Sequence, residues 1–469
     1  MSDLRMVTST NPATGQPLGD RIDHAESAVE EALSELDHTQ RTWALVPPER
    51  RGELLQHVAR AIDREADALA AGIVAEMGKP LRQARGEVAK CAGLLRYYAE
   101  QAAALVATRS VATEARRSEV RVQPLGVILG IMPWNFPLWQ IVRWAVPALV
   151  TGNTCLVKPA DNTAGSCEHL VRLFDEAAAS LGDEHCSRVL ASVSVSNERA
   201  GDLIDDDRIA GVSLTGSGRA GRSVAARAGA ALKPSVLELG GSDAAVVLPG
   251  VDFDRVLPKL VQARFQNTGQ TCVAAKRYLL HADIADEFRE RFVEAVLALQ
   301  VGDPTEETTD VGPLARGDLR ESLHEQVERT VVEGARLLIG GQPLALPGDL
   351  AGGFFYEPTV LDQVTEEMTP FREELFGPAA SLVEARDNAE LLRLANATPY
   401  GLSATVWTDD RERADDFVQH LHAGAVFVNE LAKSDWRLPF GGIKASGYGR
   451  ELGGYGIAEF ANLKTVWVD

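Results

Sequence analysis

The order of short apolar runs between residues 125 and 250 is the feature that most constrains the fold. Runs of strand length lie at residues 127–129, 154–157, 189–195, 209–214, 236–239 and 245–248. Helical stretches separate several of them, for example at residues 163–181 and 220–232. Strands that alternate with helices predict a parallel sheet with right-handed crossovers, which binds its ligands at the carboxyl ends of the strands.

The segments on either side complete the prediction of fold class. Residues 24–43, 48–77 and 80–107 carry Ala, Leu and Val at helical spacing, and a second α/β region follows up to about residue 431. Prolines stand at two of the predicted helix starts, and Gly78 ends the second helix. Because 469 residues exceed the usual size of one hydrophobic core, we expect two α/β domains with the site between them.

Charge and hydropathy argue against several classes of partner. The 67 acidic residues outnumber the 47 basic ones and give a formal charge of −20, which disfavours binding to nucleic acids and to anionic membranes. The most apolar stretch, residues 125–157, is interrupted by prolines and by Arg143, so we interpret it as buried interior rather than a membrane helix. The first residues lack the basic and apolar segments of a secretory signal, and we expect a cytoplasmic protein.

The cysteines predict neither disulfides nor a metal site. The five are Cys91, Cys155, Cys167, Cys186 and Cys272. Their number is odd and they show no CxxC or His-paired spacing, so a reducing compartment suits them. At least one of them is a candidate for a reactive thiol, and composition does not identify which.

A glycine-rich turn follows the predicted strand at residues 209–214. Gly216, Gly218 and Gly221 fit the GxGxxG pattern of dinucleotide-binding turns. Glu238 lies about 20 residues further on, where this pattern places an acid on the ribose. Taken alone, the match predicts a dinucleotide site that includes Glu238. A glycine-rich turn without a ligand is the alternative, because a single GxGxxG is a weak signal.

Six segments, taken together, resemble the aldehyde dehydrogenase superfamily. They are residues 133–137 (PWNFP), 158–161 (KPAD), 237–241 (LELGG), 267–272 (NTGQTC), 374–378 (ELFGP) and 439–447 (PFGGIKASG). They occur in the order and at roughly the spacing of that superfamily, so the resemblance covers essentially the whole chain. It implies a nicotinamide-dependent oxidation of an aldehyde to a carboxylic acid.

The resemblance also implies a division into domains and an assembly. A dinucleotide-binding domain of residues 1–108 and 125–240 and a catalytic domain of residues 241–435 would both be doubly wound α/β units. Residues 109–124 and 454–469 would form a small β element that exposes a sheet edge in a monomer. The expected assembly is therefore a homodimer or a homotetramer.

Three residues carry the chemistry that the resemblance implies. The thiolate of Cys272 attacks the aldehyde carbonyl, because hydride transfer requires a tetrahedral intermediate. The side-chain amide of Asn135 and the backbone N–H of Cys272 stabilise the oxyanion of that intermediate. After hydride transfer a thioester remains, and Glu238 activates the water that hydrolyses it. This role replaces the ribose contact suggested by the glycine pattern. The other four cysteines fit structural positions better.

The cofactor implied by the resemblance is NAD, with NADP as the alternative. Lys158 would contact the adenine ribose and Ser217 the pyrophosphate, while Glu374 would hold the nicotinamide ribose and Phe376 would lie against the ring. The full set of expected cofactor residues is Trp134, Lys158, Asp161, Gly216, Ser217, Gly221, Leu239, Glu374 and Phe376. No metal is expected.

Two details refine the cofactor prediction. Gly216 and Gly221 match the recurring glycines of the superfamily, and Gly218 does not, so the GxGxxG match is partly accidental. Asp161 stands where the superfamily places a residue near the adenine ribose. A carboxylate there accepts hydrogen bonds from the ribose hydroxyls and repels a 2′-phosphate, which favours NAD. Lys158 acts in the opposite direction.

The substrate predicted from the resemblance is a short semialdehyde. Residues 237–243 and 434–442 are most similar to those of bacterial succinate-semialdehyde dehydrogenases, and Ser434 is an expected substrate residue. Arg143 would bind the distal carboxylate, and its alternatives are a surface position or a pair with an internal acid. Some such enzymes carry a second arginine six residues before the cysteine, where this chain has Gln266.

Other functions stay open at this point. Lactaldehyde and glycolaldehyde dehydrogenases also carry an arginine at the position of Arg143, so another small aldehyde is an alternative substrate. A CoA-acylating enzyme needs no hydrolytic base, and Glu238 argues against it. A non-catalytic paralogue is disfavoured because Cys272, Glu238 and Asn135 are all present.

Overall fold

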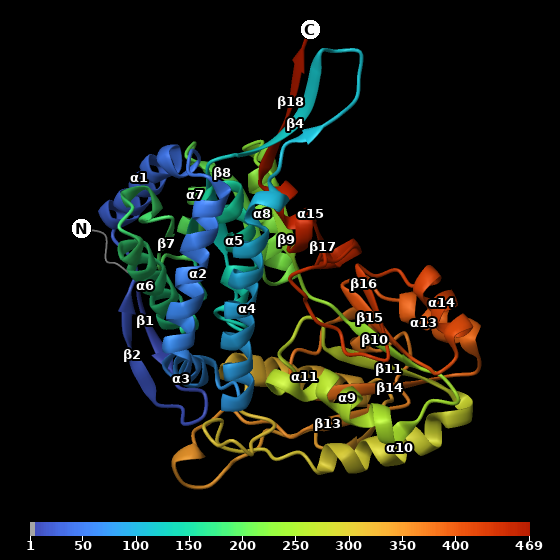
Figure 1. The fold of residues 1–469 in the computed structure, drawn as a ribbon. Helices are drawn as coiled ribbons and strands as arrows, with labels where there is room; N and C mark the ends of the chain where they lie inside the picture. Colours follow the sequence, from blue (N-terminus) through green and yellow to red (C-terminus); the bar gives the residue numbers. More distant parts are fainter. Residues whose placement is uncertain (1–4) are drawn as a thin grey trace.

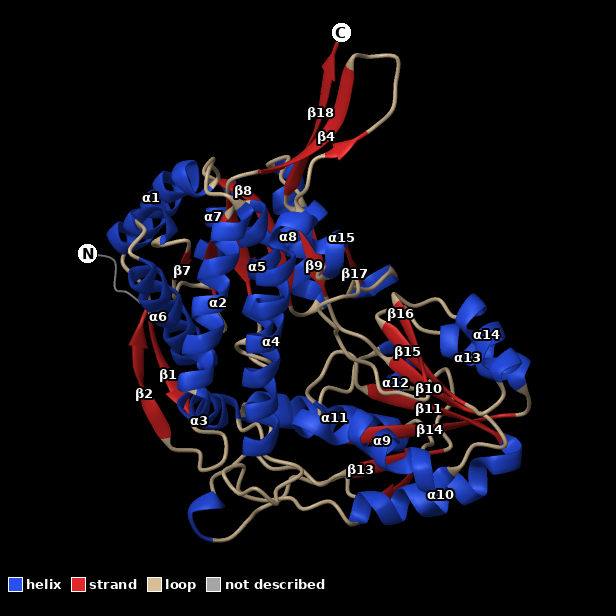
Figure 2. Ribbon diagram, in the orientation of Figure 1, coloured by secondary structure: helices blue, strands red, loops and turns tan. Residues whose placement is uncertain are grey.

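The computed structural model describes residues 5–469. Figure 1 shows two large α/β bodies side by side, with a narrow β arm that extends away from them and carries the C-terminus. Figure 2 shows that each body contains a sheet with helices packed against it. This arrangement confirms the predicted fold class of two α/β units and a small β element.

The first large sheet contains most of the predicted strands. Its members are β5 (Val127–Ile131), β6 (Thr154–Lys158), β7 (Leu190–Ser192), β8 (Ile209–Thr215), β9 (Ser235–Glu238) and β17 (Gly447–Tyr448). Their order is β17-β9-β8-β5-β6-β7. All pairs are parallel except β17 with β9, so the predicted parallel sheet is confirmed.

Helices cover this sheet. They are α1 (Glu26–Trp43), α2 (Pro48–Arg64), α3 (Ala66–Met77), α4 (Leu81–Leu105), α5 (Trp139–Thr151), α6 (Ala164–Leu181), α7 (Asn197–Asp205) and α8 (Gly218–Ala230). The helix predicted over residues 48–77 is two helices, because Glu65 leaves the helical conformation at φ −108° and ψ 19°. Gly78 ends α3 in the left-handed region at φ 75°, as predicted. Every residue of α5 is buried, which explains its apolar sequence.

The second large sheet is built from later residues. Its strands are β10 (Asp243–Val247), β11 (Ala275–His281), β12 (Arg336–Ile339), β13 (Thr359–Asp362), β14 (Ala379–Ala385), β15 (Ser403–Trp407) and β16 (Ala425–Val428). They follow the order β12-β13-β14-β11-β10-β15-β16, and only β12 is antiparallel to its neighbour. The predicted run at residues 245–248 therefore belongs to this sheet and not to the first.

The remaining helices belong mainly to the second half of the chain. The α-helices are α9 (Phe253–Phe265), α10 (Ala282–Leu297), α11 (Gly317–Val332), α12 (Thr369–Arg372), α13 (Asn388–Asn396), α14 (Arg411–His420) and α15 (Gly453–Glu459). Short 3₁₀ helices are η1 (Asp161–Thr163), η2 (Glu184–Cys186), η3 (Gln266–Gly269), η4 (Gly348–Leu350) and η5 (Lys444–Ser446). Among the described residues, no helix is long and apolar enough to cross a membrane.

Two small antiparallel sheets complete the fold. A hairpin of β1 (Met6–Thr10) and β2 (Pro17–Ile22), which the sequence did not predict, contacts η1. In the arm, β18 (Ala461–Val468) pairs along its length with β4 (Arg117–Pro124), and β3 (Arg109–Ser110) pairs with β4. The predicted pairing of the last residues with the segment near residue 120 is thus confirmed. Its role in assembly and the domain boundaries stay predictions.

Candidate active site

A cavity of about 680 Å³ reaches Cys272 from the space between α4, α5 and α9. Arg143 and Ser434, the two expected substrate residues, both line it. Asn267 and Gln266 line it as well, beside the nucleophile. The cavity therefore brings Cys272 together with the residues that the sequence proposed for the substrate.

The turn before Cys272 has an unusual backbone. Asn267, Thr268 and Gly269 have φ values of 54°, 57° and 72°, and left-handed non-glycine residues cost about 1–3 kcal/mol each. Tertiary hydrogen bonds hold the turn: Thr268 Oγ1 donates to the Gly312 carbonyl at 3.2 Å, and Asn267 Nδ2 donates to the Asn135 carbonyl at 2.9 Å. A Cβ at Gly269 would lie 2.3 Å from the Gly377 carbonyl oxygen, so only glycine fits.

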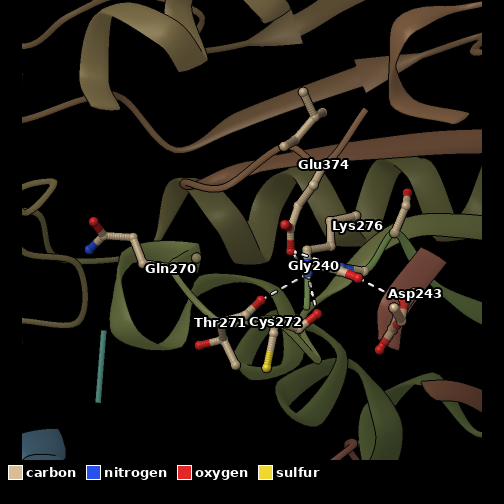
Figure 3. Close-up of polar contacts among 12 residues, drawn as sticks. Gly240, Asp243, Gln270, Thr271, Cys272, Lys276 and Glu374 are labelled. Atoms are coloured by element: carbon tan, nitrogen blue, oxygen red, sulfur yellow. Dashed lines mark hydrogen bonds and ion pairs between the residues drawn. The ribbon is translucent and has the colours of Figure 1, made fainter. Parts of the chain in front are cut away.

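Lys276 fixes the same turn from the other side, as Figure 3 shows. Its side chain is fully buried, and Nζ donates to the carbonyl oxygens of Thr271, at 2.9 Å, and of Cys272. The ammonium also forms an ion pair of 3.0 Å with Glu374. Lys276 thus links the expected ribose residue to the nucleophile turn. Sequence reasoning missed it, because a lysine near the start of a buried strand gives no indication of its partners.

The surroundings of Cys272 favour the protonated form of its thiol. Burial raises its pKa to about 11, and the nearby cations Arg143 and Lys276 oppose this rise. The thiol must therefore lose its proton before it attacks a carbonyl, when substrate and cofactor occupy the site. All five cysteines are free. Burial also raises the pKa of the other four, and each of these is fully buried, which fits structural positions.

The donors expected for the oxyanion lie beside Cys272. Asn135 is buried, and its Nδ2 donates to the Gln270 carbonyl at 3.1 Å, which leaves the second N–H of the amide for a ligand. In the described chain, the backbone N–H of Cys272 donates to no protein acceptor. A developing oxyanion at Cys272 needs N–H donors of this kind.

Glu238 ends β9 and is 2% exposed. Within residues 5–469, neither of its carboxyl oxygens has a hydrogen-bond partner. Burial raises its pKa well above the usual range, and the nearby Glu451 raises it further, while Arg143 opposes the rise. A carboxyl group without protein partners and with a raised pKa fits a general base that accepts a proton from a water molecule.

A buried ion pair lies next to Glu238. The Arg143 guanidinium pairs with Glu451, and both side chains are 2% exposed. Arg143 also donates from Nη2 to Thr215 Oγ1 at 3.2 Å and stacks 4.6 Å from the centre of the Phe440 ring. The pair with an internal acid was the alternative for Arg143, and it is present although Arg143 also lines the cavity. The sequence did not reveal Glu451 as a residue of the site.

The glycine turn between β8 and α8 is built to accept an anion. Ser217 caps α8 by accepting a hydrogen bond from the Ala220 amide at 3.3 Å. The amides of Gly218 and Arg219, the first two of α8, have no acceptor among the described residues, so they are available to phosphate oxygens. A Cβ at Gly221 would lie 2.6 Å from Leu239, and one at Gly218 would meet only the flexible Arg222 at 3.5 Å. Gly221, but not Gly218, is therefore needed for packing.

The residues expected near the adenine ribose form a charged cluster. Lys158 is buried, and its Nζ lies 3.4 Å from Asp161 Oδ1. Arg5 donates to both carboxylate oxygens of Asp161, at 2.9 and 3.2 Å, and the pKa of Asp161 is lowered although burial acts against this. The sequence sets Asp161 against Lys158 alone and gives no indication of Arg5. Two cations accompany it, so its repulsion of a 2′-phosphate is weakened.

The nicotinamide side of the expected site contains Glu374, Phe376 and Trp134. Glu374 Oε1 accepts from the Gly241 amide at 3.1 Å, and the described residues offer Oε2 no donor. A Cβ at Gly240 would lie 2.2 Å from that Oε2. The rings of Phe376 and Trp134 meet edge to face at 5.7 Å. One carboxylate oxygen and an aromatic surface are thus available to a ribosyl nicotinamide, which supplies a hydride acceptor when bound.

Arg264 positions this segment, and the sequence did not indicate it. Its side chain is fully buried and donates to the carbonyl oxygens of Ala379, at 2.6 Å, and Leu375, at 2.8 Å. A further bond of 3.3 Å reaches the Gly269 carbonyl in the nucleophile turn. One arginine therefore joins the nicotinamide side to the Cys272 turn. No cluster that could hold a metal ion occurs in the described part of the chain.

Known proteins are similar to this chain in sequence and in fold over nearly their full length. A family profile described as "Aldehyde dehydrogenase family" matches residues 1–466. The succinate semialdehyde dehydrogenase [NAD(P)+] Sad of Escherichia coli is 44% identical, over 98% of this chain and 97% of that protein. A succinate-semialdehyde dehydrogenase [NADP(+)] of Mycobacterium avium is 43% identical over 98% and 96%.

A solved structure agrees with these relatives. The succinic semialdehyde dehydrogenase of Streptococcus pyogenes, in complex with NADP+, superposes with a TM-score of 0.94 at 30% identity, and the match covers 98% of this chain and 99% of that one. Together with the placement of the Cys272 turn, the glycine turn and Glu238, these matches show that the chain belongs to the aldehyde dehydrogenase family and is an NAD(P)-dependent aldehyde dehydrogenase.

Proposed function

We propose that the physiological substrate is a short aldehyde with a distal carboxylate, such as succinate semialdehyde. The observation that carries this proposal is the cationic lining of the cavity at Cys272, where Arg143 and Lys90 face the same space. An anionic substrate gains from such a lining before any specific contact forms. The names of the relatives at 42–44% identity support the same substrate class.

In the proposed reaction, the Cys272 thiol releases its proton to water in the cavity, and the thiolate attacks the aldehyde carbon. The Asn135 amide and the Cys272 backbone N–H stabilise the resulting oxyanion. A nicotinamide held near Glu374 and Phe376 would accept the hydride, and the acyl group would then remain as a thioester on Cys272. Glu238, in its carboxylate form, takes a proton from a water molecule, which attacks the thioester and releases the acid and the thiolate.

The proposal is tested by comparing aldehydes of similar length. Formation of reduced cofactor is followed by absorbance with succinate semialdehyde and with butanal, in the absence of CoA. We expect the specificity constant kcat/KM to be higher for succinate semialdehyde. A preference for butanal, or for lactaldehyde or glycolaldehyde, would contradict the substrate proposal and leave the family assignment intact. An absolute requirement for CoA would instead favour an acylating enzyme.

We propose the remaining properties on related grounds. Both NAD and NADP are expected to serve, with the preference set by the cluster of Arg5, Lys158 and Asp161. A homodimer or homotetramer is expected, because Leu463 and Trp467 on the β18 arm are about half exposed, at 54% and 49%. The domain division at residues 240–241 and a cytoplasmic location are retained as predictions.

A further inference from the structure

Lys90 is a cation of the substrate cavity that no acid neutralises. It lies on α4, lines the cavity and is half-buried. Its Nζ donates to Ser434 Oγ at 2.9 Å and lies 3.9 Å from the centre of the Trp139 ring. In the described chain, Lys90 forms no ion pair, whereas the other cations deep in the cavity, Lys79 and Arg143, each have a carboxylate partner.

The acids nearest to Lys90 are already engaged. Glu87, one helical turn away, pairs with Lys79 and accepts hydrogen bonds from the amides of Leu138 and Trp139, both at 3.0 Å. Asp435 accepts from the Arg437 side chain at 2.8 and 2.7 Å. Lys90 thus has no internal carboxylate to move toward, and a cation shielded from water is costly without one.

The hydroxyl of Ser434 is oriented by the same contacts. Its oxygen accepts hydrogen bonds from Trp139 Nε1, at 3.0 Å, and from Lys90 Nζ. Both lone pairs are then occupied, and the structure gives the hydroxyl proton no acceptor within residues 5–469. The ammonium has three N–H groups, of which Ser434 and the Trp139 ring use two. One hydroxyl proton and one ammonium proton therefore remain for an anion.

We propose that Lys90 and Ser434 together bind the distal carboxylate of the substrate, one oxygen accepting from each. This inference rests on the proposed semialdehyde substrate and names a specificity-determining residue for it. Gln266, which also lines the cavity, carries no charge. Lys90 supplies the second positive charge from a different helix, and a bound carboxylate would relieve its repulsion with Arg143.

The first test removes the charge of Lys90 and keeps its length. Lys90→Met should lower kcat/KM for succinate semialdehyde by roughly 10- to 150-fold, the range for losing a charge-assisted hydrogen bond, and should change kcat/KM for butanal by less than about 3-fold. Lys90→Arg should restore part of the loss. Lys433→Met is the matched control, because Lys433 is exposed at the same cavity and screened by solvent.

A second readout measures the binding of a carboxylate inhibitor rather than the conversion of the semialdehyde itself. Succinate should compete with the semialdehyde in the wild-type enzyme, and its inhibition constant should rise by a similar factor in Lys90→Met, whereas the inhibition constant of butyrate rises less than about 3-fold. Equal losses for both aldehydes would show that Lys90 is only structural. Equal losses of kcat/KM for succinate semialdehyde in Lys90→Met and Lys433→Met would show that only the general positive potential of the cavity matters, and not a specific contact of Lys90. Either result overturns the inference.

The pH dependence gives a signature of the ammonium itself. Burial and the repulsion of Arg143 lower the pKa of Lys90 to about 8, while Cys91, Glu87 and Asp435 act weakly in the opposite direction. The ratio of kcat/KM for succinate semialdehyde to that for butanal cancels the titration of Cys272 and Glu238. This ratio should fall as the pH rises through about 8 in the wild type and stay flat in Lys90→Met.

A wild-type enzyme that prefers butanal would refute the substrate proposal, and this inference with it. A wild type that prefers the semialdehyde and keeps that preference in Lys90→Met would refute this inference alone.

Discussion

The buried pair of Arg143 and Glu451 predicts an asymmetry between single and double variants. Removing Arg143 alone leaves the Glu451 carboxylate buried next to Glu238, both at about 2% exposure. Breaking a buried pair in this way costs about 3–5 kcal/mol, or roughly a 100- to 4,000-fold increase in the unfolding constant at about 1.4 kcal/mol per decade. Replacing both partners by apolar residues of similar size is often neutral.

Arg143→Met should therefore be much less stable than Arg143→Met combined with Glu451→Met. Unfolding in urea can be followed through tryptophan fluorescence, because the fully buried Trp144 is the residue next to Arg143. With a slope of about 3 kcal/mol per M of urea, the midpoint of the single variant should fall by roughly 1–1.7 M, and the double variant should recover most of that. A single variant with an unchanged midpoint, or a double variant as unstable as the single one, would refute the reasoning.

Three further predictions address the reaction and the cofactor. Cys272→Ala should abolish turnover. Glu238→Gln should still release a stoichiometric burst of reduced cofactor, measured by stopped-flow absorbance, and then deacylate slowly. A missing burst would contradict the assigned division of roles. Because burial and, after it, the neighbouring Glu451 raise the pKa of Glu238, and only the carboxylate form is a base, kcat limited by deacylation should rise with pH through that pKa. Glu451→Gln should shift this rise to lower pH, and an unshifted profile would show that the two carboxyl groups do not interact. Arg5→Ala should expose the charge of Asp161 and increase the ratio of kcat/KM with NAD to that with NADP by roughly 10-fold or more; an unchanged ratio would show that Arg5 does not modulate cofactor choice.

The sequence could predict those helices and strands that a pattern of neighbouring residues defines. The parallel strands β5, β6 and β8 are continuous apolar runs, and Gly78 ends its helix because a left-handed residue is needed there. The break at Glu65 escaped prediction, since the apolar periodicity continues through it into α3. The hairpin of β1 and β2 escaped as well, because its burial pattern is mostly exposed and carries little alternation.

The residues of the reaction were predictable for a different reason. A covalent thioester mechanism requires a thiol, a base and an oxyanion donor, and this demand fixes residue types within short motifs. The groups that tune those residues are subject to no such demand. Lys276 and Arg264 act on carbonyl oxygens, which every residue offers, so their partners leave no trace in the sequence.

Electrostatic roles follow from distances that only the folded chain defines. Asp161 was interpreted by its position after Lys158, and the third member of the cluster, Arg5, lies 156 residues away in the chain. Lys90 and Ser434 are separated by 344 residues, so neither predicts the other. In a sequence, a single charged residue is by default interpreted as an exposed surface residue. Whether a charge is neutralised inside the fold, as for Arg143, or left for a ligand, as for Lys90, depends on which acids remain unengaged nearby. The number of unengaged acids near a cation therefore separates a structural cation from a substrate-binding one. Counting these acids requires the complete set of ion pairs around the cavity.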